Sequence, residues 1–334
     1  MAKLVEQIPS LKLNDGHSIP VLGYGTGTAW YKSVDDGKLD RPLIDSIKTA
    51  IKLGYYHLDG AEGDHRMLLL LEPIINATLV YNTESELGVA IKESGVPREK
   101  LFVTTKVYNG ISDIPKSFKA SLSKLQLDYV DLYVSGFPIF VVRNSDLLLP
   151  HFSYLIHAPF FAKSDAELQE AWAELEKIKE SGKAKSIGVS NYLKQHLEPT
   201  IRTAKVVPAI NQIECHPYLQ HKGLLDYHRE HGILTEAYAP LTAVTKAKPG
   251  PVDDVFSFLS KKYYVSEGEI ALKWCIDQNI VPITTSGKES RLSDYLRAMT
   301  FELNPAEIQR ISEKGEEKHY RGFWTKQFDP KDKS

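Results

Sequence analysis

The chain has 334 residues, of which 42% are apolar and 25% charged, and its formal net charge is −2 at pH 7. This balance is typical of a globular protein with a sizeable core, and it gives no basis for nucleic-acid or membrane binding. Cys215 and Cys275 offer neither a disulfide framework nor a zinc spacing, and no signal-peptide core follows Met1, so we expect a cytoplasmic protein without a metal.

Short β-rich runs alternate with amphipathic helical runs along the chain. Residues 11–23 predict a β-hairpin because they carry an Asp-Gly turn at Asp15-Gly16. Strands are then expected within 21–26, 55–60, 101–107, 130–133 or 154–159, 185–190, 208–214, 233–240 and 280–286. Helices are expected within 42–54, 84–95, 114–127, 165–182, 192–204, 222–232, 255–279 and 290–299, with C-terminal glycines at Gly54, Gly95, Gly182 and Gly232.

Eight successive βα units in a chain of this length predict an α/β fold, a (β/α)8 TIM barrel with an N-terminal β-hairpin. The alternative is a doubly wound sheet, but no G-x-G-x-x-G opens the first βα turn, and the run from Gly25 to Thr28 does not match it. No linker or shift in composition divides the chain, so residues 1–334 are expected to form one domain.

Polar side chains stand at the ends of the expected strands, where such a barrel carries its active site. Asp59, Lys106 and His157 end three of these strands. Each alone has an ordinary structural explanation. Asp59 could cap the following loop, Lys106 could merely pair with Asp59, and His157 could be a core histidine with its hydrogen bonds satisfied. Their coincidence at equivalent strand ends favours a catalytic set. The other strand ends carry Ser190, Asn191, Gln212, Glu214, His216, Tyr238 and the run from Thr284 to Ser286.

Several short motifs follow one another in a fixed order. They are DGAE at 59–62, VYNTESELG at 80–88, TTK at 104–106, YLIHAPF at 154–160, IGVSNY at 187–192, NQIECHP at 211–217 and EAYAPL at 236–241. Together they resemble the aldo-keto reductase family over nearly the whole chain. TTSGKESRL at 284–292 and YRGFW at 320–324 resemble the fungal-type branch that reduces conjugated polyketones, ketopantoyl lactone and α-ketoamides.

The resemblance implies a catalytic tetrad of Asp59, Tyr81, Lys106 and His157. A free phenol has a pKa of ~10, and the Lys106 ammonium, held by Asp59, is expected to lower that pKa. Tyr81 then protonates the carbonyl oxygen as hydride reaches the carbon, while neutral His157 holds and orients the substrate. The implied activity is that of an oxidoreductase that reduces an aldehyde, ketone or 1,2-dicarbonyl to an alcohol.

The resemblance also implies NADPH as the cofactor. Tyr238 would stack on the nicotinamide, and Ser286, Lys288 and Arg291 would bind the 2′-phosphate, although the two cations also fit an ordinary solvated helix start. Ala239 stands where relatives often carry a serine that touches the pyrophosphate, so one hydrogen bond is missing there. The remaining cofactor contacts are expected from Thr26, Gly27, Asp59, Ser190, Asn191, Gln212 and Leu241.

Trp30 is expected to wall the substrate pocket, whereas Tyr56 is assigned to ordinary packing. Cys215 is expected to be buried and inert. A small carbonyl compound is the expected partner, with no nucleic acid and no membrane, and the protein is expected to be a monomer or weak dimer.

Residues 63–79 and 133–153 interrupt the family motifs, and their removal restores LDGAEVYNTESELG and VDLYLIHAPFF. The two insertions can be functional loops, degenerate additions or translated introns. Codons favour the last explanation, since Gly63 and Leu79-Val80 can encode a splice donor and acceptor in phase, and so can Leu132–Val134 and Phe152-Ser153. Our hypothesis is a retained intron or an error in the gene structure.

The second insertion falls inside the fourth barrel strand. We expect FSYLIH at 152–157 to form that strand, with the insertion looped out at the opposite face, so that His157 keeps its catalytic place. If VDLYV forms the strand instead, His157 is displaced and activity fails. The alternative function is therefore a catalytically impaired, nucleotide-binding relative, and a third is an aldolase that uses Lys106 as a Schiff-base amine.

Overall fold

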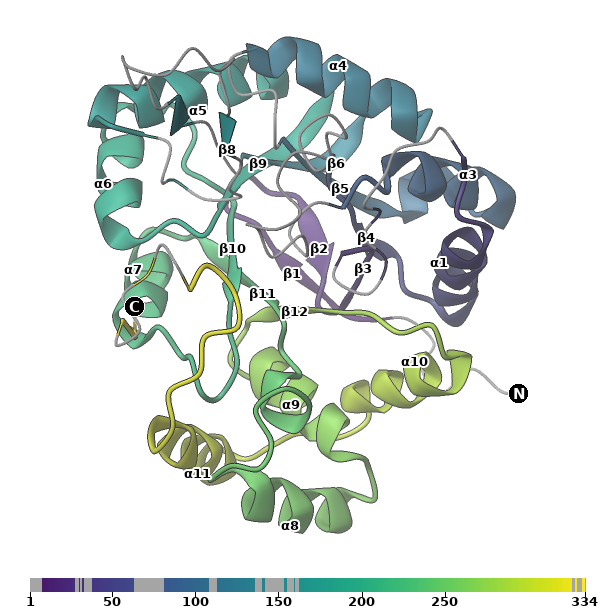
Figure 1. Cartoon of the computed structure of the whole chain (residues 1–334), viewed down its shortest axis with the longest axis vertical. Coiled ribbons are helices and arrows are strands. Elements are labelled where there is room, and N and C mark those ends of the chain that lie inside the picture. Colours follow the sequence, from purple (N-terminus) through teal and green to yellow (C-terminus); the bar gives the residue numbers. More distant parts are fainter. Residues whose placement is uncertain are drawn as a thin grey trace, which may run out of the picture.

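The computed structural model describes residues 8–27, 30, 32, 38–62, 81–107, 113–135, 140–141, 153–154, 159, 162–325, 328 and 332–333. Eight parallel strands close into a barrel, and each strand pairs with the next one along the chain (Figure 1). The last strand pairs with the first through Ile283 and Gly23. The strands are β3 (Gly23–Gly25), β4 (His57–Asp59), β5 (Phe102–Val107), β6 (Val130–Ser135), β9 (Ala184–Ser190), β10 (Ile210–Glu214), β11 (Leu234–Tyr238) and β12 (Val281–Thr284).

Helices surround this barrel, so the predicted (β/α)8 fold is confirmed (Figure 1). The predicted glycines end their helices in the left-handed conformation, with φ of 105° at Gly54 and 67° at Gly95. The helices are α1 (Arg41–Leu53), α3 (Glu84–Ser94), α4 (Ile114–Leu125), α5 (Asp165–Glu180), α6 (Lys194–Thr203), α7 (Lys222–Glu230), α8 (Asp253–Tyr263), α9 (Glu267–Ile276), α10 (Glu289–Tyr295) and α11 (Pro305–Glu316).

The N-terminal hairpin is also confirmed. Strands β1 (Ser10–Lys12) and β2 (Ser18–Pro20) are antiparallel, with Leu11 opposite Ile19. Gly16 has a φ of 89°, a left-handed conformation that glycine adopts without steric cost at the turn. The hairpin precedes β3, the first strand of the barrel.

One helical prediction was wrong in detail, and one helix was not predicted. The expected single helix at 255–279 is two helices, because Tyr264 turns left-handed with a φ of 57° and Ser266 caps α9 in a reciprocal capping box with Glu269. The structure adds α11, whose start combines the same type of capping box, between Asn304 and Glu307, with a proline at its first turn.

The prediction for the fourth barrel strand was wrong. Val130–Ser135 forms β6, between β5 and β9, with Val134 opposite Lys106 and Gly188. Asp131 explains this choice, since its carboxylate accepts a hydrogen bond from the Val103 amide at 3.0 Å and pairs with Arg98 at 2.7 Å. Because Asp131 is held in this way, the segment directly after α4 forms the fourth barrel strand in place of FSYLIH.

Ser153–Tyr154, at the start of the expected strand, forms β8 instead. It pairs with β7 (Phe140–Val141) in a separate two-stranded antiparallel sheet. His157 and all of residues 63–79 lie outside the described residues, as does most of 133–153. The expectations for the two insertions therefore fall mainly on parts of the chain that the structure does not describe.

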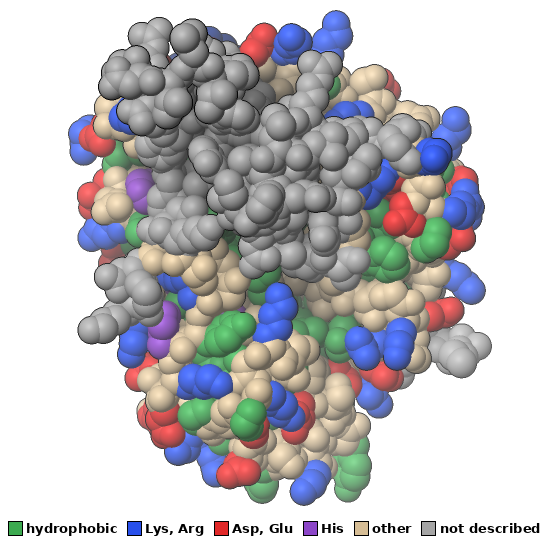
Figure 2. Space-filling view, in the orientation of Figure 1, with side chains coloured by type: hydrophobic (Ala, Val, Ile, Leu, Met, Phe, Trp, Pro, Cys, Tyr) green, Lys and Arg blue, Asp and Glu red, His purple; other side chains and the backbone are tan. Residues whose placement is uncertain are grey.

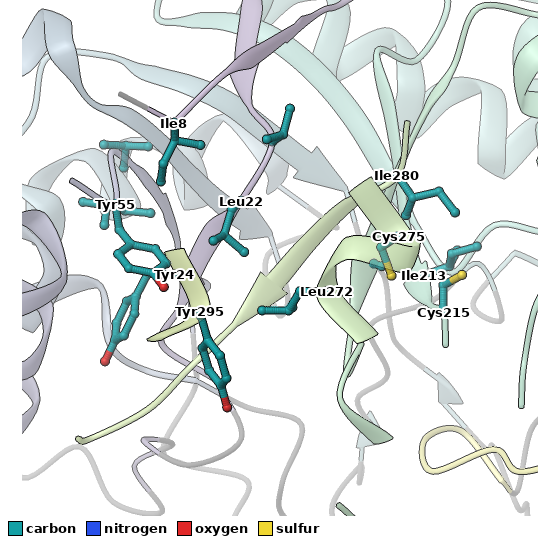
Figure 3. Close-up of a cluster of buried hydrophobic side chains, with 14 of the residues drawn as sticks. Ile8, Leu22, Tyr24, Tyr55, Ile213, Cys215, Leu272, Cys275, Ile280 and Tyr295 are labelled. Carbon is teal, nitrogen blue, oxygen red and sulfur yellow. The ribbon is translucent and has the colours of Figure 1, made fainter. Parts of the chain in front are cut away.

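The core fills the space between the barrel and its helices. Figure 3 shows one part of it, where Cys215 and Cys275 lie among aliphatic side chains. Both cysteines are buried, and burial raises the pKa of the Cys215 thiol to about 12. The expected inertness of Cys215 follows, because the reactive form of cysteine is the thiolate.

The described surface intersperses acidic and basic side chains, in keeping with the small net charge (Figure 2). Within the residues that the structure describes, no helix is long and apolar enough to span a bilayer.

One buried carboxyl group predicts a pH dependence of stability. Glu84, at the start of α3, accepts a hydrogen bond from the Thr105 hydroxyl at 2.6 Å, and burial raises its pKa from 4.5 to about 7. Between these two pH values the unfolded chain has lost this proton and the folded chain retains it, so stability falls as pH rises through the window. The loss amounts to about 3 kcal/mol.

Glu84→Gln should remove this loss, because the amide keeps an acceptor for Thr105 and never ionises. Urea unfolding from pH 5 to pH 8 measures it, with the variant gaining stability over the parent as pH rises. Glu86→Gln is the contrasting control. The Glu86 carboxylate accepts a hydrogen bond from the Lys32 ammonium at 2.8 Å, so removal of its charge should destabilise the fold at every pH from 5 to 8. If the free energy of unfolding changed equally with pH in the parent and in Glu84→Gln, the prediction would be contradicted.

Candidate active site

An ion pair lies inside the C-terminal end of the barrel. The Lys106 ammonium, from β5, donates to both carboxylate oxygens of Asp59, from β4, at 2.6 Å, and to the Gly60 carbonyl at 3.1 Å. Asp59 and Lys106 are 1% and 2% exposed. Burial raises the pKa of the Asp59 carboxyl, and the Lys106 ammonium opposes that rise. Two hydrogen bonds to one carboxylate fix the direction of the lysine.

Tyr81 lies beside this pair, at the start of the chain segment that leads into α3. The Lys106 ammonium is 4.9 Å from the centre of the Tyr81 ring. On the other side, a Cβ atom on Gly27 would stand 2.3 Å from the ring carbon that bears the hydroxyl and 2.6 Å from the hydroxyl oxygen. The structure thus brings together Asp59, Tyr81 and Lys106, and a glycine makes room for the phenol.

The electrostatics of Tyr81 differ from the sequence prediction. Burial raises the pKa of the phenol, and the negative charges of Asp59 and Glu236 raise it further. The expected lowering of this pKa by Lys106 does not outweigh these effects, because the ammonium points at Asp59, which offsets part of its charge. Tyr81 is therefore held in its protonated form.

A second carboxylate contributes to this effect. Glu236, from β11, is fully buried, and the Gln212 side-chain amide donates to it and, at 3.0 Å, to Asp59. His57 faces the same carboxylate, with 3.2 Å between its Nε2 and the Glu236 Oε1. The amide nitrogen of Gln212, a predicted cofactor contact, therefore lies between two acids.

A cavity opens above these residues, lined by several of the predicted side chains. Ser190 ends β9, Asn191 follows it, and Tyr238 ends β11. The Tyr238 hydroxyl donates to Asn191 Oδ1 at 2.8 Å, and Asn191 Nδ2 donates to the Ser190 hydroxyl at 3.0 Å. The lining is Gly25, Gly27, Tyr81, Lys106, Ser190, Asn191, Gln212, Tyr238, Ala239, Ile283, Thr284, Thr285, Phe323 and Trp324.

This donor set fits a flat aromatic amide. Neutral hydroxyl and amide groups from Ser190 and Asn191 stand beside the ring of Tyr238, which offers a stacking face. The space beside Gly27 is taken by the Tyr81 phenol, which therefore lines the same cavity. Among the residues that the structure describes, no three His, Cys, Asp or Glu side chains are grouped as metal ligands.

Backbone geometry around the cavity is unusual. Asn191, Ala239 and Trp324 have φ of 57°, 54° and 60°, in the left-handed region. Asparagine tolerates that region, whereas alanine and tryptophan rarely occupy it. Such conformations gather at functional sites, where the surrounding structure holds them in place.

Phe323 and Trp324 are lining residues that the sequence prediction missed. The indole nitrogen of Trp324 donates to the Tyr238 hydroxyl at 3.1 Å, and the Phe323 ring meets the Tyr238 ring edge-on at 5.3 Å between centroids. Both residues belong to the YRGFW motif, which had been read only as a mark of one branch of the family. No periodicity or spacing links that motif to β11.

The predicted phosphate-binding residues lie together after β12. Ser286 is buried, and its hydroxyl accepts from the Lys288 amide at 3.1 Å. Lys288 and Arg291 are exposed, and neither forms an ion pair with a described residue. The Trp30 ring lies over Gly287, 3.2 Å from where a Cβ atom would stand, so Trp30 covers this loop and is not among the lining residues of the cavity.

The remaining predicted site residues occupy supporting positions. The Thr26 hydroxyl donates to the Asp59 carbonyl at 3.1 Å and lies 2.7 Å from the Thr83 hydroxyl. Leu241, half-buried, precedes a short 3₁₀ helix after β11. His157 lies outside the described residues.

The contact between Gly27 and Tyr81 gives a prediction. Gly27→Ala places a methyl group where the phenol stands, so the ring must move, and kcat should fall about 100-fold. Gly223→Ala, in α7, is the control, because nothing lies within 4 Å of the added methyl. Steady-state kinetics measure the effect, and a thermal melt checks the fold. An unchanged kcat in Gly27→Ala would show that Tyr81 need not stand where it does.

Comparison with known proteins adds an independent result. Residues 21–316 match the Aldo/keto reductase family. The chain is 36% identical over 310 residues to the NAD/NADP-dependent indole-3-acetaldehyde reductase of Schizosaccharomyces pombe, covering 92% of this chain and 96% of the relative. It is 35% identical over 329 residues to the NADPH-dependent alpha-keto amide reductase of Saccharomyces cerevisiae, covering 94% and 93%. The solved aldo-keto reductase of Bombyx mori in complex with NADP is similar at a TM-score of 0.73 and 29% identity, covering 92% and 93%.

Proposed function

The chain belongs to the aldo/keto reductase family, and from this premise we propose that it reduces a carbonyl group to an alcohol with NADPH, Tyr81 being the proton donor. The observation that carries the proposal is the cluster of Tyr81, Lys106 and Asp59 at the mouth of the barrel, in one cavity with Ser190, Asn191 and Tyr238. Two of its relatives are named as NAD(P)-dependent reductases of carbonyl compounds.

The residues divide the chemistry in the following way. A bound reduced nicotinamide supplies hydride to the carbonyl carbon. Tyr81, kept protonated by burial, gives its proton to the carbonyl oxygen as negative charge develops there. Lys106 stabilises the phenolate that is left, and Asp59 holds the lysine charged and oriented.

The same arrangement argues against imine chemistry at Lys106. An amine that attacks a carbonyl must be neutral, and burial beside an uncompensated cation or in an apolar pocket is the usual means of achieving this. Here the Lys106 nitrogen donates to both Asp59 oxygens at 2.6 Å, which favours the charged form.

Cofactor binding falls to the residues along the rim of β9 to β12. Tyr238 would stack against the nicotinamide while Ser190 and Asn191 bind its amide. Ser286, Lys288 and Arg291 would hold the 2′-phosphate, and the two cations are exposed with no described acid paired to them. Because NADH lacks this phosphate, the two cations are the reason that we propose NADPH as the cofactor.

Arg291→Ala should therefore raise KM for NADPH about 10- to 100-fold, which is the loss of one charge-assisted hydrogen bond. KM for NADH should stay within twofold, because NADH lacks the phosphate. Arg202→Ala, an exposed cation on α6, is the matched control. Equal effects of Arg291→Ala on the two nucleotides would remove the proposed phosphate site.

One observation favours a second candidate function, a nucleotide-binding relative with impaired chemistry. Because β6 continues through Val134 and Ser135, the fourth strand does not end in the LIH sequence that carries His157. The strand end at which the family resemblance places the substrate-orienting histidine is formed here by Ser135, and His157 itself lies outside the described residues. An NADPH-oxidation assay with a 1,2-dicarbonyl separates the two functions, because the impaired protein binds NADPH and turns over no substrate.

A further inference from the structure

The segment after α11 crosses back to the barrel. This C-terminal strap, residues 318–325, leaves α11 and runs beside the end of β10 (Figure 1). Within the strap, the Tyr320 amide donates to the Tyr218 carbonyl at 3.2 Å. The strap then supplies Phe323 and Trp324 to the cavity that also contains Tyr81 and Lys106.

A single carboxylate holds the strap at this point. Glu214, the last residue of β10, is 1% exposed. Its Oε1 accepts from the Gly322 amide at 2.8 Å and its Oε2 accepts from the Phe323 amide at 3.1 Å. Two consecutive backbone amides therefore point at the two oxygens of one buried side chain, which is a fork-like grip on the main chain.

A histidine fixes the carboxylate from behind. His216 Nε2 is 3.2 Å from Glu214 Oε1, and the Tyr218 amide donates to His216 Nδ1 at 3.2 Å. Because Nδ1 accepts a hydrogen bond, the proton of the neutral ring is on Nε2, which can then donate to Glu214. Glu214 thus receives three donors, the amides of Gly322 and Phe323 and the ring of His216.

The contact between Glu214 and the strap affects the cavity through the side chains of Phe323 and Trp324. Trp324 donates to the Tyr238 hydroxyl at 3.1 Å, and that hydroxyl donates to Asn191 at 2.8 Å. A displaced strap would remove both the indole wall and the hydrogen bond that sets the orientation of the Tyr238 hydroxyl. Glu214 itself is not a lining residue, so it would act only through the residues that it holds.

We propose that Glu214 is a positioning residue whose buried carboxylate clamps the backbone of the C-terminal strap, making Phe323 and Trp324 a fixed aromatic wall of the reaction cavity. The clamp is a property of the fold. Its effect on turnover rests on the proposed reductase function. The two parts are therefore tested by separate measurements.

Glu214→Gln tests the clamp in the full chain. An amide keeps one acceptor oxygen and turns an N–H group towards a backbone N–H, so at least one of the two strap contacts is lost. Hydrogen–deuterium exchange of the Gly322 and Phe323 amides should accelerate about tenfold or more. Exchange in the barrel strands should stay unchanged.

Glu176→Gln is a matched control. Glu176, on α5, is also buried, and its Oε1 accepts from two consecutive backbone amides, Lys205 at 2.6 Å and Val206 at 2.9 Å. The chemistry of the substitution is the same, but the segment held by Glu176 precedes β10 and does not line the cavity. Glu176→Gln should leave the exchange of the strap unchanged.

The kinetic test measures whether Glu214→Gln changes KM and leaves kcat nearly constant. With NADPH and an aromatic aldehyde, Glu214→Gln should raise the KM of the aldehyde about tenfold while kcat stays within about threefold, and Glu176→Gln should change neither. An equal fall of kcat in both variants would reduce Glu214 to a general structural role. If the parent chain reduces no carbonyl compound, the proposed function fails, and the exchange result still decides the clamp.

A second variant guards against misfolding of Glu214→Gln. Gly322→Pro removes one donor from the strap side and leaves the barrel sequence intact. The Phe323 amide should then exchange as fast as in Glu214→Gln. Unchanged exchange of Phe323 in Gly322→Pro, or fast exchange of the strap in the parent chain, would overturn the proposal.

Discussion

Tyr81→Phe is expected to lower kcat for carbonyl reduction about 10²- to 10⁴-fold, which is the contribution of a well-placed general acid. The ring remains, so its packing against Gly27 and its contact with the Lys106 ammonium should persist. The variant loses only the hydroxyl. NADPH should therefore bind with unchanged affinity, which fluorescence titration measures beside the steady-state assay.

Tyr133→Phe is the matched control for this variant. Tyr133 is fully buried, its ring packs against Phe118, and its hydroxyl has no hydrogen-bond partner among the described residues. Removing that hydroxyl should change kcat less than twofold. Were Tyr81→Phe to retain the activity of the parent, another group would have to donate the proton.

Deleting residues 133–153 is expected to raise kcat about 10²- to 10³-fold over the full chain. The deletion joins VDL to YLIH, so the restored sequence continues β6 without a change of register up to the position of Tyr133. His157 then comes two residues after the one that faces Lys106, in place of Gly136. A preorganised donor to a developing oxyanion contributes about that factor to kcat.

Deletion of residues 63–79 alone is the control for the second insertion. Tyr81 already stands beside Lys106 with those residues present, so their removal should change kcat less than tenfold. The account of His157 is contradicted if the chain without 133–153 gains nothing, or if the 63–79 deletion alone gives the whole gain. Sequencing the mature transcript shows which of these chains the cell makes, and the intron hypothesis predicts a message that lacks both stretches.

Periodicity and strand-end chemistry predicted most of the fold and the central part of the site. The hairpin, the order of the βα units and the strand-end residues Asp59 and Lys106 followed from local patterns, because each element carries its own alternation, cap or turn. The placement of Tyr81 came from the family motif. These features depend on short segments of chain, which a sequence displays directly.

The failures share a physical origin in contacts between distant segments. VDLY and FSYLIH both have the pattern of a buried strand, and the choice was made by the pairing of Asp131 with Arg98 and the Val103 amide. The rise in the pKa of Tyr81 depends on Glu236 from another strand. Trp324 reaches Tyr238 only because the C-terminal strap folds back.

The most direct test of the central claim is a crystal structure of the full chain with NADP bound. The account predicts that the Tyr81 hydroxyl faces C4 of the nicotinamide across the space of one carbonyl group, with Lys106 behind the phenol and Tyr238 against the ring. A structure in which Tyr81 points away from C4 and a different acid stands near it would contradict the account.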